Sequence, residues 1–202
     1  MAPFAPHLDT QISQRYSAKA LEQKLANKLA LQDELGWPQE KKRAILCIPA
    51  GMTEKLGGAL FQKVLPGILS MSVEVLVLGR GSENFGTLFT KLAKEQSHRI
   101  HIVSESDAAM RKMYAASDMA LFFSDPSGLP ELRHALNYGV VPVAPACECL
   151  EDYDPVQEHG TAFIAESATP WMWFAALVRA LETYKFPFDW KTIQRQCMES
   201  VA

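Results

Sequence analysis

The residues best suited to chemistry lie in one short segment, 119–139, where an apolar run is followed by a loop and an amphipathic stretch. The loop carries the carboxylate of Asp125 and the backbone amides of Gly128 and Leu129, and Glu131 opens the amphipathic stretch. This order predicts a strand, a tight loop and a helix whose N-terminus binds an anion such as phosphate. We therefore place the candidate site at this loop.

Further candidate binding residues lie in loops that follow other apolar runs. Gly79 and Gly81 are such residues. Glycines let the backbone approach a ligand closely. Because the carboxyl ends of parallel strands meet at one edge of a sheet, we expect the loops 50–58, 79–81, 104–107 and 124–130 to line one crevice.

Six short, mainly apolar runs alternate with helical patterns along the chain. The predicted strands are 44–49, 73–78, 99–103, 119–123, 140–144 and 162–164. Continuous rather than alternating apolar strands are typical of a parallel sheet that is buried on both faces. The fold class is therefore predicted as α/β, with a Rossmann-like parallel sheet and helices on both faces.

The helices that connect these strands follow from apolar spacing and from capping residues. Their predicted ranges are 17–36, 59–70, 85–96, 107–116, 171–184 and 190–199, besides the helix that ends at Gly139. Ser17 is the predicted N-cap of the first helix, on which Lys24 and Lys28 are expected to face solvent. Pro66 is expected to kink or end the helix that contains it.

Composition excludes several classes of function. A chain of 202 residues suits one sizeable domain, and its net charge of −3 gives no basic footprint for nucleic acid. Its apolar runs are far shorter than the roughly 20 residues that span a membrane. No secretory signal opens the sequence. We therefore expect a cytoplasmic protein that binds neither nucleic acid nor membrane.

Four cysteines occur, at positions 47, 147, 149 and 197. The C-x-C pair of Cys147 and Cys149 could bind a metal or form a redox pair, but no second pair lies at ligand spacing. Reduced thiols in a cytoplasmic protein are the favoured interpretation. We predict no metal and no cofactor.

Several motifs together resemble one family. They are Phe4, Pro6, Asp9 and Tyr16 near the start, then KLANKLALQDELGWP, SDAAMRKMYAASDMALF, YGVVPV and the tail GTAFIAES…WFAALVRALETY…WKTIQRQCM. With these motifs the chain resembles the C-terminal half of the bacterial glycogen synthases and plant starch synthases. These are retaining glucosyltransferases of the two-domain GT-B architecture, and the resemblance covers nearly the whole chain.

The resemblance implies a division of the chain and a ligand. Residues 1–16 correspond to the linker between the two domains, and residues 17–202 to a single Rossmann-like nucleotide-sugar-binding domain. That domain would bind ADP-glucose, while an N-terminal domain would bind the α-glucan that is elongated by α-1,4 linkage. This sequence contains no counterpart of the N-terminal domain, so the isolated chain is expected to be inactive.

The crevice residues depart from the family pattern. Gly51 stands where the family has a phosphate-binding arginine, and Leu56 where it has a lysine, with Lys55 next to it. Ser106 replaces the tyrosine that stacks on adenine, and Asp125 replaces a longer glutamate. The resemblance thus implies Asp125 as the candidate catalytic carboxylate. It implies as candidate nucleotide-sugar-binding residues Gly51, Lys55, Gly79, Gly81, Ser106, Gly128, Leu129 and Glu131. Three hypotheses stay open: an ADP-glucose-binding synthase domain, a degenerate domain with a binding, regulatory or scaffolding role, and a transferase with another donor.

Overall fold

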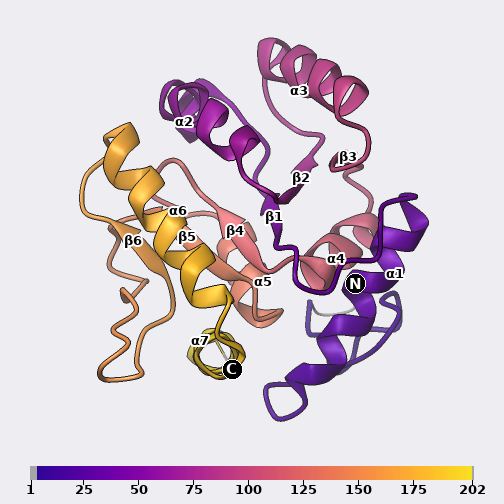
Figure 1. Ribbon diagram of the computed structural model, residues 1–202, viewed down its shortest axis with the longest axis vertical. Coiled ribbons are helices and arrows are strands. Elements are labelled where there is room, and N and C mark those ends of the chain that lie inside the picture. The colour runs from indigo at the N-terminus through magenta and orange to yellow at the C-terminus, as the bar shows by residue number, and fades with distance from the viewer. Residues whose placement is uncertain (1–3, 202) are drawn as a thin grey trace.

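The computed structural model describes residues 4–201, which form one six-stranded sheet with helices on both faces (Figure 1). The strands are β1 (Ile45–Ile48), β2 (Glu74–Leu78), β3 (Ile100–Val103), β4 (Met119–Leu121), β5 (Val141–Pro145) and β6 (Phe163–Ala165). Neighbouring strands are parallel, in the order β3-β2-β1-β4-β5-β6. The predicted fold class is confirmed.

Two layers of helices cover this sheet. On one face lie α2 (Gly58–Ser70), α3 (Glu83–Glu95) and α6 (Pro170–Tyr184), and α2 packs against α6. On the other lie α1 (Lys24–Glu34), α4 (Asp107–Ala116), α5 (Pro130–Asn137) and α7 (Pro187–Ser200), where α1 contacts α4 and α5 contacts α7. The central strands between the layers are fully buried, which is why their sequences are apolar on both faces.

The start of the first helix differs from its prediction. A short 3₁₀ turn, η1 (Leu21–Gln23), precedes α1, and Ser17 is not an N-cap. Instead the Ser17 carbonyl accepts a hydrogen bond from the Ala20 amide, and Ala20 has a non-helical backbone, so the regular helix begins only at Lys24.

The expectation that Lys24 and Lys28 face solvent is also wrong, because both are buried. Lys24 Nζ donates to the carbonyl oxygens of Tyr114 and Ala115 at the C-terminal end of α4. Lys28 Nζ forms an ion pair of 2.8 Å with Asp118, which also accepts from the Ile45 amide at the start of β1. The two lysines therefore attach α1 to the sheet layer.

The structure refines two smaller helix predictions. Pro66 lies inside α2, which continues to Ser70, so the proline does not end the helix. The last helix begins at Pro187, three residues before the predicted Trp190, because proline suits the first turn of a helix.

The N-terminal segment packs on the domain. Asp9 is 2% exposed and pairs with the buried Arg111 of α4 at 3.2 Å. The Tyr16 hydroxyl donates to the Tyr138 carbonyl at 2.8 Å. The division into residues 1–16 and 17–202 stays a prediction, and its residues 1–3 and 202 lie outside the described residues.

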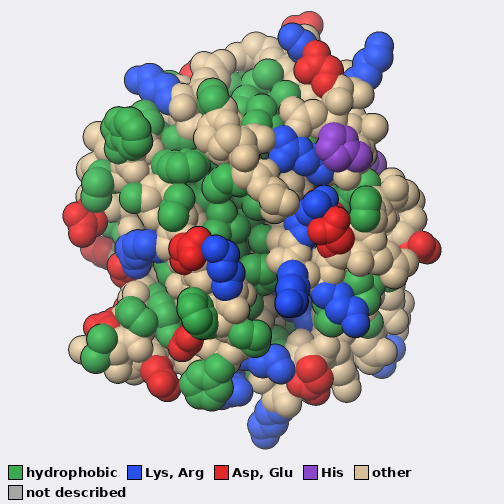
Figure 2. Space-filling view, viewed as in Figure 1, with side chains coloured by type: hydrophobic (Ala, Val, Ile, Leu, Met, Phe, Trp, Pro, Cys, Tyr) green, Lys and Arg blue, Asp and Glu red, His purple; other side chains and the backbone are tan. Residues whose placement is uncertain are grey.

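The surface is uneven in character. Figure 2 shows apolar side chains gathered over α6, and Lys and Arg side chains toward α1. On α6 and the start of α7 the exposed apolar side chains are those of Trp171, Met172, Val178, Phe186 and Phe188. Over residues 4–201, every helix is too short or too polar to cross a membrane.

Candidate functional site

The candidate site lies at the carboxyl edge of the sheet. From β1 the chain moves outward through β2 to β3 and then returns to β4 on the opposite side of β1. The helices that follow β1 and β4 therefore lie on opposite faces of the sheet. Ligands of open α/β sheets bind at this switch point. The expectation that the loops meet is confirmed for those after β1 and β2, because Met52 bridges to Gly81.

Two glycines allow these loops to lie against each other. Gly51 has φ +71°, and a Cβ atom there would lie 2.0 Å from the Arg80 carbonyl oxygen. Gly81 has φ +139°, and its Cβ would lie 2.0 Å from the Met52 carbonyl oxygen. Since no side chain fits in either place, Gly51 and Gly81 shape the loops through their lack of a Cβ. Gly79 continues this edge and donates to the Val103 carbonyl at 2.7 Å.

The loop after β4 is held from both sides of the sheet edge. The Phe122 carbonyl accepts from Trp173 Nε1 of α6 at 2.9 Å, and the Phe123 ring stacks on the Trp173 indole at 4.3 Å. A Cβ on Gly57 would lie 2.2 Å from the Phe123 carbonyl oxygen, so the loop after β1 packs closely here as well. These contacts fix the backbone that leads to Asp125.

Asp125 lies exposed at the outer part of this loop. Its Oδ1 accepts from the backbone amide and the hydroxyl of Ser127, and these hydrogen bonds lower the pKa of Asp125. The Gly128 amide has no hydrogen-bond partner within residues 4–201. The Leu129 amide, by contrast, donates to the Pro126 carbonyl at 2.9 Å, so the prediction that both amides are open to an anion is wrong for Leu129.

Arg80 is a site residue that was not among the candidates predicted from the sequence. Its Nε donates to Glu105 at 3.0 Å, and its Nη1 donates to Glu131 at 2.8 Å. The Glu105 hydrogen bond is the largest effect raising the pKa of Arg80, and Glu131 adds to it. Glu131 is nearly buried in the first turn of α5, so Arg80 ties the loop after β2 to the loop after β3 and to α5.

Two further predicted residues, Lys55 and Ser106, take no part in the ion pairs of Arg80 with Glu105 and Glu131. Lys55 is exposed and has no polar partner among the described residues, whereas Leu56 packs against the core. Ser106 caps α4 by accepting from the Ala109 amide at 3.3 Å. Among residues 4–201, the ion pairs of Arg80 are with Glu105 and Glu131 and do not include Lys55 or Ser106.

The charge of the crevice is acidic on balance. In the loops 49–57, 79–82, 104–106, 122–129 and 146–150, Lys55 and Arg80 are the cationic residues, against Glu54, Glu105, Asp125 and Glu148. Arg80 is already engaged by two carboxylates. Within residues 4–201 no group of three or more His, Cys, Asp or Glu side chains could hold a metal ion. The donors that the crevice still offers to an anion are the Gly128 amide and the exposed Lys55 side chain.

A cavity of about 740 Å³ borders the crevice beside α3. Gly79, Arg80 and Gly81 line one side of it, and Phe89 and Lys94 of α3 line the other. This volume suits a small organic ligand.

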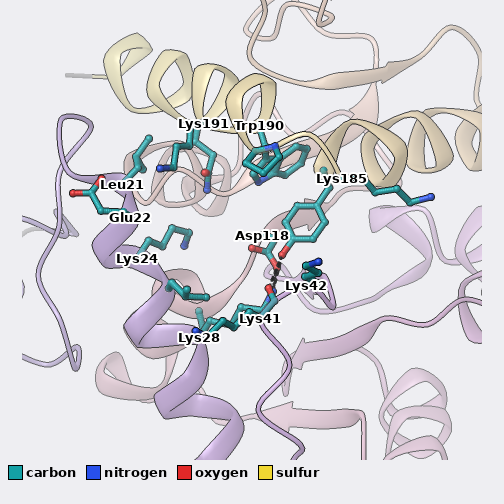
Figure 3. A pocket seen from close by; sticks show the side chains of 15 residues that line it. Leu21, Glu22, Lys24, Lys28, Lys41, Lys42, Asp118, Lys185, Trp190 and Lys191 are labelled. Atoms are coloured by element: carbon teal, nitrogen blue, oxygen red, sulfur yellow. Dashed lines mark hydrogen bonds and ion pairs between the residues drawn. The ribbon is translucent and has the colours of Figure 1, made fainter.

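A second cavity of about 590 Å³ lies at the opposite edge of the sheet, between α1 and α7 (Figure 3). Lys24 and Lys28 face Trp190 across it, and Lys41 and Lys42 precede β1 there. Lys24 and Lys28 bond to groups inside the fold, so their side chains serve the structure. The cavity lies away from the crevice.

Fold and crevice together define the class of protein. A parallel sheet in this order, with its crevice between the first and fourth strands, is a Rossmann-like domain of the kind that binds nucleotides. The catalytic domain of starch synthase IV from Arabidopsis thaliana, solved with ADP and acarbose, superposes with a TM-score of 0.82 at 23% identity, over 96% of this chain and 42% of that one. A glycosyltransferase from Rickettsia africae gives a TM-score of 0.63 at 16% identity. The fold is thus half of a GT-B fold.

The sequence is similar to those of glycogen synthases. The chain is 30% identical to glycogen synthase 1 of Synechocystis over 98% of its own length and 43% of that protein. It is 29% identical to the glycogen synthase of Trichodesmium erythraeum over 96% of this chain and 44% of that protein. No protein-family model matches the chain. Over nearly its whole length the chain is therefore similar to glycogen synthases, and it spans less than half the length of these relatives.

Proposed function

We propose that this chain is the donor domain of a glycogen or starch synthase-type retaining glucosyltransferase, and that it binds ADP-glucose without transferring glucose by itself. One observation carries the proposal: similarity to glycogen synthases runs over 98% of the chain, and so includes every strand whose carboxyl end borders the crevice. A domain that retains this whole edge is suited to hold a nucleotide sugar there.

In this proposal the ligand lies between the loops after β1 and β4. The Gly128 amide would donate to a phosphate oxygen, Lys55 would supply charge from the loop after β1, and Asp125 would accept from a sugar hydroxyl. The cavity beside Gly79 and Gly81 gives room for the rest of the nucleotide. Elongation of an α-glucan would need a second domain to hold the acceptor, and the chain's unpaired cysteines fit a cytoplasmic location.

A second candidate is a domain that has kept the fold for a binding, regulatory or scaffolding role without the donor. The carboxylates around Arg80 favour it, because Glu105 and Glu131 occupy the guanidinium that a diphosphate would need. The Leu129 amide, which already donates to Pro126, and the surplus of acidic side chains also favour this second candidate. Each would weaken the binding of an anionic ligand, either by electrostatic repulsion or by loss of a hydrogen-bond donor.

Calorimetric titration of the full chain with ADP and with ADP-glucose separates the two candidates. The donor-domain proposal expects a Kd of about 0.1 mM or tighter, which corresponds to about −5.5 kcal/mol. Lys55→Ala should weaken that binding, whereas Lys63→Ala, which removes an exposed lysine of α2, should leave it unchanged. Absence of heat and of thermal stabilisation at millimolar ligand would overturn the donor-domain proposal.

A further inference from the structure

Cys147 and Cys149 are brought together by a tight turn directly after β5. The Leu150 amide closes this turn on the Cys147 carbonyl, and the buried Leu150 side chain anchors it to the core. The two Sγ atoms lie 3.0 Å apart, and both thiols are free. A disulfide bond has an S–S length of about 2.05 Å, so the sulfurs need to approach each other by only about 1 Å.

The two cysteines of the pair differ in their exposure to solvent. Cys149 is exposed and Cys147 is half-buried, whereas Cys47 in β1 and Cys197 in α7 are fully buried. Burial raises the pKa of Cys147, and it raises the pKa of Cys47 to about 12. Since the thiolate is the reactive form and must be reached by its partner, chemistry at sulfur is directed to the exposed pair.

We propose that Cys147 and Cys149 form a redox-active dithiol on the rim of the crevice, which is converted to an intramolecular disulfide by small-molecule disulfides such as oxidised glutathione. The Cys149 thiolate attacks one sulfur of the oxidant and expels one thiolate. The Cys147 thiolate then attacks Cys149 Sγ in the mixed disulfide and expels the second. One disulfide is reduced to two thiols, and the protein loses two hydrogen atoms.

The position of the pair connects its redox state to the candidate site. Cys149 Sγ lies 3.4 Å from the Ser127 hydroxyl, which itself donates to Asp125. Drawing Cys149 Sγ toward Cys147 changes this contact between the loops after β5 and β4. A disulfide in so small a ring is strained and therefore easily reduced, as reversible disulfides are.

The test equilibrates the full chain in glutathione buffers of increasing oxidised-to-reduced ratio, quenches with acid, and alkylates the thiols in denaturant. Mass spectrometry should find that Cys147 and Cys149 lose reactivity together, with loss of two hydrogen atoms, while Cys47 and Cys197 remain fully alkylated. Cys147→Ser should instead accumulate glutathione on Cys149. Glu148→Gln keeps both thiols and serves as the matched control, which should oxidise like the wild type.

A second measurement addresses the reduced pair directly. Phenylarsine oxide condenses with two neighbouring thiols and releases one water, so the wild type should take up one equivalent, and Cys147→Ser and Cys149→Ser none. The proposal is overturned if oxidised wild type carries a stable glutathione adduct on Cys149 instead of the internal disulfide. It is equally overturned if the single serine variants bind the arsenical as the wild type does. Neither readout depends on nucleotide-sugar binding.

Discussion

Gly51 lies so close to the Arg80 carbonyl that a Cβ atom on it would stand 2.0 Å from that oxygen. The resemblance implies a phosphate-binding arginine at this position, and here the close packing of two loops excludes any side chain. Gly51→Ala should therefore lower the free energy of unfolding by about 2–4 kcal/mol, because it adds a steric clash to an unfavourable positive φ. Urea denaturation measures this loss.

Gly128→Ala is the matched control for this substitution. Nothing lies within 4 Å of a Cβ built on Gly128, so its cost should stay below about 1 kcal/mol. Equal stability of the two variants would mean that the loops after β1 and β2 do not pack in this way. The Gly51→Arg substitution, which would restore the family's charge, should unfold the loop rather than restore binding.

Neutralising the carboxylates around Arg80 should strengthen anion binding. Glu131→Gln keeps the shape of the side chain but removes the charge that engages Arg80 Nη1 at 2.8 Å. We expect the ADP affinity to rise about 5- to 10-fold, which corresponds to about 1–1.4 kcal/mol, and more in combination with Glu105→Gln. Titration calorimetry at low ionic strength measures the gain, which salt should reduce.

Glu95→Gln makes the same change of net charge on α3, where Glu95 lies 3.9 Å from Lys91. It should leave the ADP affinity unchanged. A fall in affinity for Glu131→Gln would contradict the prediction and would mean that Glu131 contacts the ligand itself.

The N-terminal segment should contribute strongly to stability through Asp9. The Asp9 carboxylate pairs with Arg111, whose side chain is fully buried, and it accepts a hydrogen bond from the Tyr138 hydroxyl. Asp9→Ala should lower the free energy of unfolding by about 3 kcal/mol, because a buried charge loses a partner. Asp107→Ala removes the more exposed partner of Arg111 and should cost about 1 kcal/mol or less. Similar losses in urea denaturation would contradict this ranking.

The fold could be predicted because its signals are local. Continuous apolar runs such as Met119–Phe123 mark buried strands, and the parallel arrangement then places the loops at one edge. The same reasoning failed where a polar residue serves a distant partner. Lys28 has the spacing of a solvent-facing residue, yet it pairs with Asp118, 90 residues away.

The candidate site could be located from the sequence, but its electrostatics could not. Gly-Arg-Gly after β2 indicates a tight loop, whereas the partners of Arg80 lie 25 and 51 residues away, and no local pattern joins them. The Leu129 amide is a predicted phosphate donor because it lies at the start of a helix. Its bond to Pro126 depends on how the turn closes, which residue types alone do not fix.

Lys24 should make stability depend on pH. Burial is the main cause that lowers the pKa of Lys24 to about 7, while a lysine in the unfolded chain has a pKa of about 10.4. Above pH 7 the unfolded chain therefore binds more protons at this side chain than the folded protein does. By linkage, the Lys24 contribution to the free energy of unfolding increases as pH rises from about 7, with a slope of at most about 1.4 kcal/mol per pH unit.

Lys24→Met removes this titration, so wild type should gain stability relative to the variant between about pH 7 and 8.5. Urea denaturation at several pH values measures the difference, which cancels the contributions of other titrating groups. Lys63→Met removes an exposed lysine of α2, and its curve should run parallel to that of the wild type. If the Lys24→Met curve is also parallel, the ammonium group keeps its proton, held by the Tyr114 and Ala115 carbonyls at the end of α4.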